Sequence, residues 1–207
     1  RYDPQALKIR TGDDPAWTRH PTRDVAVMEV SAPPEFAKAA IPLAWLAKDD
    51  TFDEYAVGPG DELMALGFPR GLSANASGFP ILRAGRVASF PLAPSANNPT
   101  FLLDFAVFPG NSGGPVYMAQ GARRRPGAQQ AADAQFIAGL LTQQVELGGE
   151  RLEIGIVTHA RFVREAIELL DKPEEAPAIR AASLAAVAGT QGTGLLPAEA
   201  AAATASA

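Results

Sequence analysis

The sequence contains no cysteine among its 207 residues, which excludes disulfides, a thiol nucleophile and zinc–thiolate sites. Histidine is scarce as well, because only His20 and His159 are present. We therefore expect neither a multi-histidine metal site nor another cofactor. The sequence also lacks any apolar run close to the roughly 18 to 20 residues that a membrane-spanning helix needs, so no membrane span is predicted.

An excess of positive charge is missing too. The chain has 18 lysines and arginines against 23 aspartates and glutamates, a net charge of -5. Proteins that bind nucleic acids usually present a basic face, so we expect no nucleic-acid partner. The 47% of hydrophobic residues and 20% of charged residues instead indicate a globular protein. The sequence begins at Arg1 rather than at a methionine, and we expect a longer natural sequence.

Residues 61–158 have the alternation of apolar and polar positions that is typical of β-strands. Turns rich in proline and glycine separate short segments, which predicts a small antiparallel barrel. The predicted strands cover residues 62–67, 80–90, 101–107, 114–118, 135–145 and 151–158. Apolar residues then recur at helical spacing over residues 160–170, and Pro173 ends the predicted helix.

The N-terminal part is less regular. Strands are predicted at residues 7–10 and 24–30, and residues 31–60 are interpreted as a long connector. We divide the chain into residues 1–50, the remainder of an N-terminal barrel, and residues 51–172, a C-terminal barrel plus helix. The Ala-rich residues 173–207 are predicted to be a flexible tail.

The chemistry is concentrated in the stretch FPGNSGGP at residues 108–115. Ser112 is the candidate nucleophile, and the glycines let the backbone amides of Gly110 and Ser112 point at a developing oxyanion. Two other interpretations are an ordinary glycine-rich turn and the nucleophile elbow of an α/β-hydrolase. The elbow is disfavoured because Gly113-Gly114-Pro115 cannot readily start a helix.

Four stretches together resemble the trypsin-like serine peptidases, and specifically their bacterial, disulfide-free HtrA/DegP-type branch. They are residues 23–30, 66–71, 83–89 and 108–116, which read RDVAVMEV, LGFPRG, RAGRVAS and FPGNSGGPV. The resemblance implies an all-β, chymotrypsin-like fold of two antiparallel β-barrels, the first incomplete in this chain, with a C-terminal α-helix. It also implies a protein that lies in the periplasm or is secreted, and that acts on polypeptide substrates.

The resemblance implies roles for individual residues. Asp24 takes the place of the acid that orients the catalytic histidine, and Asn111 stands where the digestive enzymes have an aspartate. The family's histidine precedes the acid by a few tens of residues, so we expect the general base upstream of Arg1. His20 lies only four residues before Asp24 and is predicted to be a surface loop residue. His159 is predicted either to line the substrate cleft or to have a capping or surface role.

By the same resemblance, Ala106 lies at the base of the primary specificity pocket, with Val107 and Phe108 beside it. An apolar base predicts a preference for small or medium apolar side chains. The strand at residues 153–158, with Gly155 and Thr158, is predicted to be an edge strand that pairs with the substrate. The expected function is a serine endopeptidase acting through an acyl-enzyme. The alternative is a catalytically inactive trypsin-fold binding module, either a pseudoprotease or a fragment.

Overall fold

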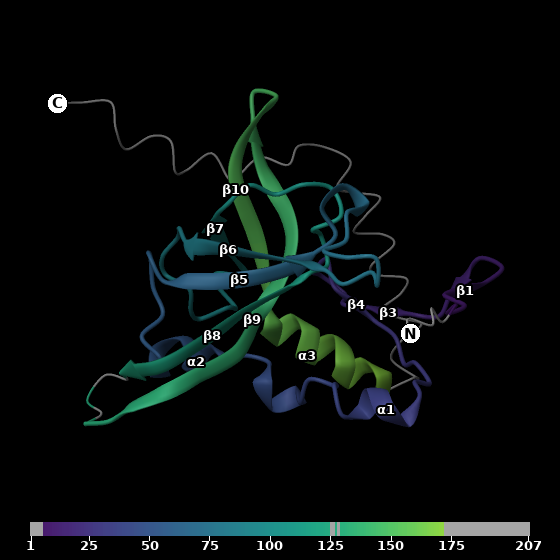
Figure 1. Cartoon of the computed structure of the whole chain (residues 1–207), viewed down its shortest axis with the longest axis horizontal. Coiled ribbons are helices and arrows are strands. Elements are labelled where there is room, and N and C mark those ends of the chain that lie inside the picture. The colour runs from purple at the N-terminus through teal and green to yellow at the C-terminus, as the bar shows by residue number, and fades with distance from the viewer. Residues whose placement is uncertain (1–5, 125–126, 128, 172–207) are drawn as a thin grey trace.

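A closed antiparallel barrel forms the centre of the molecule (Figure 1). The computed structural model describes residues 6–124, 127 and 129–171; the predicted tail at 173–207 lies outside them. The barrel order is β10-β7-β6-β5-β8-β9, and the prediction of a chymotrypsin-like all-β fold is confirmed. The strands are β5 (Glu62–Gly67), β6 (Ile81–Val87), β7 (Thr100–Asp104), β8 (Pro115–Arg124), β9 (Ala131–Leu147) and β10 (Glu150–His159).

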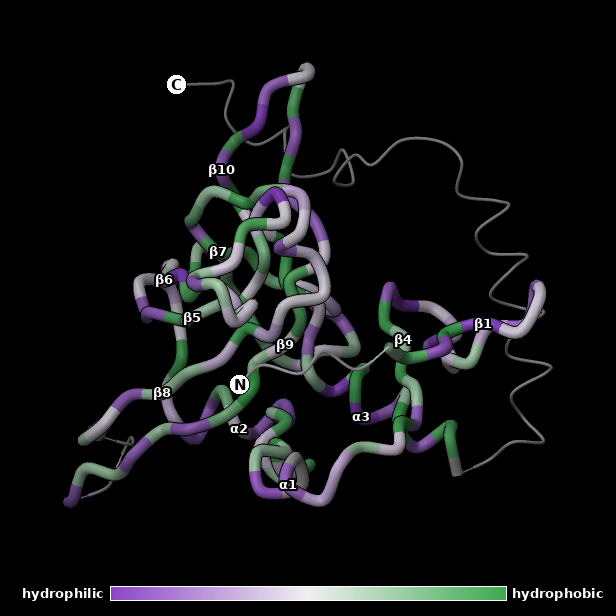
Figure 2. Tube along the Cα trace, turned by 45° about the vertical axis from the view of Figure 1, so that its right-hand side comes forward, coloured by the Kyte–Doolittle hydropathy of each residue, from purple (hydrophilic) through white to green (hydrophobic). Residues whose placement is uncertain are grey.

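Side-chain alternation explains why these segments form a barrel. Along β5, Leu63, Ala65 and Gly67 are buried while Met64 and Leu66 between them are partly exposed, so one face points into the barrel. Figure 2 shows both hydrophobic (green) and hydrophilic (purple) segments along β8 and β9. The interior is filled by large side chains with almost no exposed surface, including Phe101, Leu103 and Leu141.

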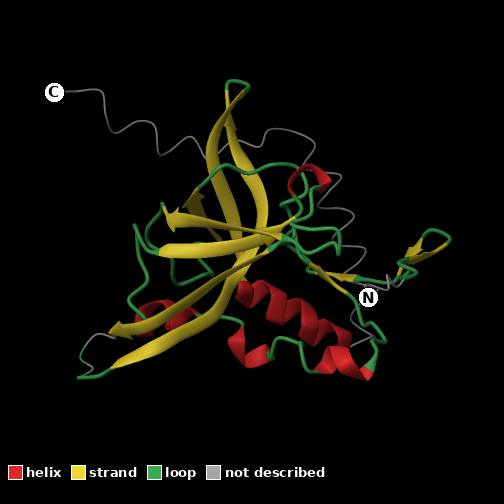
Figure 3. Cartoon of the chain, viewed as in Figure 1, coloured by secondary structure: helices red, strands yellow, loops and turns green. Residues whose placement is uncertain are grey.

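The three longest strands continue beyond the barrel as two-stranded arms (Figure 3). The β8–β9 arm is held by Arg123, whose guanidinium donates to both carboxylate oxygens of Asp61 at 2.7 Å. The same side chain donates to the backbone oxygens of Tyr55 and Ala56. Burial alone would raise the pKa of Asp61, but its hydrogen bonds, first that with Arg123, outweigh burial and lower it.

The N-terminal part forms two small sheets rather than a second barrel. They pair β1 (Arg10–Thr11) with β2 (Asp14–Pro15), and β3 (Thr18–Arg19) with β4 (Ala26–Val27). The predicted strands at 7–10 and 24–30 are therefore wrong in extent. A strand needs a partner for its backbone groups, and in the described residues β4 pairs only with two residues of β3.

The segment at residues 31–60 contains helical turns that the sequence analysis missed. They are α1 (Pro34–Ala37), η1 (Leu43–Trp45) and α2 (Asp49–Glu54). Phe52 of α2 is buried, and its ring meets Phe101 and Phe136 edge-on, with centroids 6.1 and 6.0 Å away. The segment is thus part of the barrel's packing and not merely a connector.

The predicted C-terminal helix is confirmed as α3 (Ala160–Glu168), which continues into the 3-10 turn η3 (Leu169–Asp171). Its buried residues Phe162 and Ala166 pack with Val25 in a small second core. This contact joins the N-terminal sheets to the barrel. None of the helices in the described parts of the chain is long and apolar enough to cross a membrane.

Candidate active site

The loop between β7 and β8 carries Ser112, and glycines fix its shape. Gly110 has a φ of 92°, in the left-handed region that favours glycine. A Cβ atom at Gly110 would collide with the carbonyl oxygen of Phe68, and one at Gly114 would collide with that of Leu66. The loop therefore lies directly against the end of β5, and this close approach explains the glycines in the motif.

Asn111 holds the loop together from inside. Its side chain is only 1% exposed, and its Oδ1 accepts a hydrogen bond from the amide of Phe108 at 3.0 Å. The Asn111 amide in turn donates to the carbonyl oxygen of Phe108, also at 3.0 Å. Asn111 thus stabilises the turn at residues 108–111 through hydrogen bonds of its side chain and its backbone within the loop.

The side chain of Ser112 is placed beside the middle of β9. Ser112 itself is exposed, and its Oγ donates to the carbonyl oxygen of Thr142 at 2.8 Å. Gly113 donates to the carbonyl of Leu141 at 2.7 Å, and the amide of Leu141 donates to the carbonyl of Gly114 at 2.9 Å. Sequence reasoning missed Thr142, because a backbone carbonyl leaves no signal in the sequence.

The amides of Gly110 and Ser112, predicted to form an oxyanion hole, are available for that purpose. Within the described residues neither amide donates a hydrogen bond to another protein group. Backbone amides without an acceptor can donate to a developing oxyanion, so the role of Gly110 and Ser112 stays a prediction.

Some of the predicted pocket residues lie next to one another. A Cβ atom at Gly155 would be 3.0 Å from Cγ2 of Val107, so these two residues, far apart in the sequence, are in contact. Ala106 and Phe108, on either side of buried Val107, are partly exposed. Thr158 is buried, and its Oγ1 lies 3.3 Å from Oγ1 of Thr142. Thr142 therefore contacts both Thr158, through its hydroxyl, and Ser112, through its carbonyl oxygen.

The predicted edge strand at residues 153–158 is wrong. Residues 155–158 of β10 pair with β7 on one side and with β9 on the other, so they leave no free edge for a peptide. The free edge belongs to β9 instead. Its pairing with β8 ends at Leu140, whereas its pairing with β10 continues to Leu147.

His159 lies in the core rather than at the surface. It is 1% exposed, and its ring sits between Phe52 and Phe101 with centroid distances of 5.1 and 5.0 Å. Its side chain makes no helix-capping hydrogen bond, and its Nε2 has no hydrogen-bond partner within the described chain. Burial lowers the pKa of His159 to about 4, against the opposing effect of Asp49. The prediction of a capping or surface role is wrong. The alternative, that His159 lines the substrate cleft, is wrong too, because the ring is enclosed by Phe52 and Phe101 in the core.

His20 was predicted to be a surface residue and is buried. Its Nε2 lies 3.0 Å from Oε2 of Glu165, and its Nδ1 accepts a hydrogen bond from the amide of Thr22 at 3.2 Å. The ring meets Phe162 edge-on. In the described residues no histidine nitrogen makes a hydrogen bond with Ser112 Oγ, whose bond goes to the Thr142 carbonyl.

Asp24 lies just before β4. Its side chain is exposed, while the adjacent Val25 is buried against Phe162. Within the parts of the chain that the structure describes, the Asp24 carboxylate accepts no hydrogen bond. It is free to accept one from a histidine.

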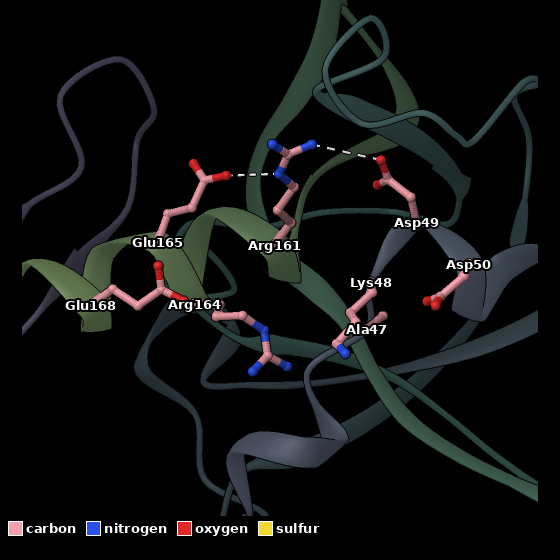
Figure 4. Close-up of a pocket in the computed structure, with 8 residues that line it drawn as sticks. All are labelled: Ala47, Lys48, Asp49, Asp50, Arg161, Arg164, Glu165 and Glu168. Carbon is pink, nitrogen blue, oxygen red and sulfur yellow. Dashed lines mark hydrogen bonds and ion pairs between the residues drawn. The ribbon is translucent and has the colours of Figure 1, made fainter.

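A cleft between α2 and α3 is lined by charged side chains of both signs (Figure 4). Arg161 joins its two sides, since its guanidinium contacts Glu165 at 2.7 Å and Asp49 at 3.6 Å. Arg164 donates to the carbonyl oxygens of Leu43 and Leu46, each at 2.8 Å. These contacts fasten α3 to the helical segment at residues 43–54, so we interpret the cleft as structural.

Comparison with known proteins supports the assignment of the fold. Residues 6–122, more than half of the chain, match the trypsin-like peptidase domain, and both Asp24 and Ser112 lie in this range. No curated protein gives a match. Among solved structures, a thermostable serine protease from an extremophilic microorganism is 15% identical with a TM-score of 0.30. The similarity covers 53% of this chain and 42% of that protease, less than half of its length. From the match over residues 6–122, this chain belongs to the family of trypsin-like peptidase domains.

Proposed function

We propose that the protein is a serine endopeptidase that hydrolyses peptide bonds through an acyl-enzyme. The observation that carries the proposal is the exposed Ser112 hydroxyl, next to two backbone amides that have no acceptor in the described chain. Membership of the trypsin-like peptidase domains supports the same chemistry.

In the proposed mechanism, Ser112 Oγ leaves the Thr142 carbonyl and attacks the carbonyl carbon of the scissile bond. A histidine upstream of Arg1 accepts the serine proton and passes it to the leaving amine as the C–N bond breaks. The amides of Gly110 and Ser112 stabilise the oxyanion, and Asp24 orients the histidine. Water then attacks the acyl-enzyme, which releases the acid product and restores the serine.

The substrate backbone would pair with the free edge of β9 at residues 142–147, and its side chain would enter a pocket of apolar character. This pocket combines Ala106, Val107 and Phe108 with Gly155, and Thr158 lies near it. Asp104 is exposed, whereas its neighbours Leu103 and Phe105 are buried, so its carboxylate points away from the barrel interior. We therefore propose cleavage after small or medium apolar residues. A peptide-library profile dominated by arginine or lysine would contradict this preference.

Labelling with a fluorophosphonate probe tests the mechanism. The natural full-length protein should be labelled at Ser112, and Ser112→Ala should remove the label while the protein stays folded. Intact mass would show whether sequence precedes Arg1 in that protein.

One observation favours the alternative, a catalytically inactive trypsin-fold binding module. Both histidines of this chain are occupied elsewhere, His20 by Glu165 and His159 by its aromatic neighbours. A folded full-length protein that takes no label at Ser112 would establish the alternative. Assignment to the disulfide-free HtrA/DegP-type branch is also a proposal, supported by the sequence resemblance and the absence of cysteine. A location in the periplasm or outside the cell is a proposal that the resemblance alone supports.

A further inference from the structure

A groove of about 580 Å³ lies beside the nucleophile loop, and Phe108 is the one residue that it shares with the primary pocket proposed above. It runs between the turn η2 (Pro69–Gly71) and the start of β6. Phe108, from the loop that carries Ser112, forms one side of it, and Leu72 and Leu82 form much of the rest.

Two arginines of this groove share one aromatic partner. The guanidinium carbons of Arg70 and Arg83 lie 5.4 and 5.5 Å from the centroid of the Phe108 ring. Within the described chain, neither guanidinium has a hydrogen bond or an ion pair, unlike those of Arg123, Arg161 and Arg164. Two sets of guanidinium donors therefore face a groove that offers them no acceptor.

The rest of the groove is apolar and open. Leu72 and Leu82 are 61% and 54% exposed, and nearby in the chain Phe68 and Phe79 are 40% and 59% exposed. Water alone would satisfy the arginines but leave this apolar surface uncovered. A ligand that matches both features carries a carboxylate next to a large apolar side chain, because a carboxylate accepts from a guanidinium in a two-pronged arrangement.

We propose that this groove binds a segment of the polypeptide substrate in which an acidic side chain lies next to a large apolar one. The inference rests on the proposed peptidase function. The groove and the nucleophile loop share backbone contacts. The backbone amide of Arg70 donates to the carbonyl oxygen of Pro109 at 2.6 Å, and the amide of Phe68 donates to that of Gly110 at 3.0 Å. A segment held there lies beside the same loop that presents Ser112, so the groove selects substrates by a feature outside the primary pocket.

Binding is measured on the full chain carrying Ser112→Ala, so that cleavage plays no part. The probe is a fluorescein-labelled, C-terminally amidated peptide with one glutamate between two leucines in a Gly/Ser background, followed by fluorescence anisotropy. Replacing its glutamate by glutamine should weaken binding by roughly tenfold or more, because a charge-assisted pair is lost. The double variant Arg70→Ala/Arg83→Ala should abolish this difference between the two peptides.

The matched control is Arg86→Ala, which removes one positive charge from the same strand outside the groove and should keep the preference for glutamate. Arg70→Lys/Arg83→Lys keeps the charge but loses the planar fork, and should retain only part of the preference. Thermal unfolding of each variant shows that the fold persists.

The proposal is overturned if the double alanine variant binds both peptides as the parent does. It is equally overturned if Arg86→Ala abolishes the preference for the glutamate peptide. It is also overturned if only a peptide with a free C-terminal carboxylate binds. A dimer in sedimentation that dissociates in the double variant would assign the groove to a second copy instead. Loss of fluorophosphonate labelling with glutamate-selective binding retained would refute the peptidase function and leave the groove in place.

Discussion

Gly110 and Gly113 are two residues of one loop with the same backbone requirement and different surroundings. Both have positive φ values, 92° and 83°, but only a Cβ at Gly110 would collide with another residue. Gly113→Ala should therefore destabilise the fold by about 1–2 kcal/mol through backbone strain alone. Gly110→Ala should destabilise it by roughly 3 kcal/mol or more, since the Phe68 turn must also move.

Urea unfolding of both variants tests this difference. In an active protein Gly110→Ala should also lower kcat/KM by at least ~10²-fold, because an oxyanion donor is displaced. Equal free energies of unfolding for the two variants would show that contact with Phe68 is unimportant.

His159 makes stability depend on pH. Its pKa is about 4 in the folded protein, against 6.5 for an exposed histidine. Between pH 6.5 and 4, His159 is protonated in the unfolded chain and neutral in the folded chain. Its contribution to the free energy of unfolding is therefore fully present above pH 6.5 and decreases as the pH falls below 6.5. The expected loss over this window is about 3 kcal/mol.

Free energies of unfolding at pH 7 and pH 4.5 should show most of this loss in the parent and a much smaller one in His159→Leu. An unchanged difference between the two pH values in that variant would mean that other groups cause the acid sensitivity.

At the level of elements, α3 is held by two arginines of different kinds. Arg164 donates to two backbone carbonyls, whereas Arg161 forms ion pairs near the surface and is 42% exposed. Arg164→Ala should destabilise the fold by about 1.5–3 kcal/mol, because those carbonyls lose charge-assisted hydrogen bonds. Arg161→Ala on the same helix is the control, and its ion pairs should contribute less than about 1 kcal/mol.

Urea unfolding in low and high salt separates the two effects. The change caused by Arg161→Ala should shrink in high salt, while that caused by Arg164→Ala should persist. The reverse order of the two destabilisations would contradict the hydrogen bonds assigned to Arg164.

The elements that the sequence predicted well are those with strong alternation or helical spacing. β5, β6 and α3 lie where apolar residues recur at the period of a strand or a helix. The helices at residues 34–54 were missed because they are only three to six residues long and are interrupted by proline. The burial of His20 and the contact of Thr142 with Ser112 depend on pairing between distant segments, which one sequence does not reveal.

For the molecule as a whole, the two apolar cores differ greatly in size. The barrel core includes residues from β5 to β10, whereas the second core consists of Val25, Phe162 and Ala166 with a few partly buried neighbours. We expect the N-terminal sheets to open more often than the barrel, because little apolar surface holds them.

Hydrogen exchange followed by mass spectrometry should show early exchange in β1–β4 and late exchange in β5 and β9. Phe162→Ala should accelerate exchange in β3 and β4 and leave β5 unchanged, since Phe162 belongs to the smaller core. Equal protection of both parts in the parent protein would mean that the chain opens as a single unit.

The register of β9 also constrains how related sequences can differ in length. Leu141 fills the barrel, and the next residue, Thr142, presents its carbonyl to Ser112. One inserted residue between Gly139 and Leu141 would turn Leu141 out of the core and move the carbonyl that accepts from Ser112. The turn at Gly148-Gly149 has open space around both glycines. Insertions and deletions in related sequences should therefore accumulate at the Gly148-Gly149 turn. They should be absent just before Thr142, where one added residue would displace both Leu141 and the carbonyl that accepts from Ser112.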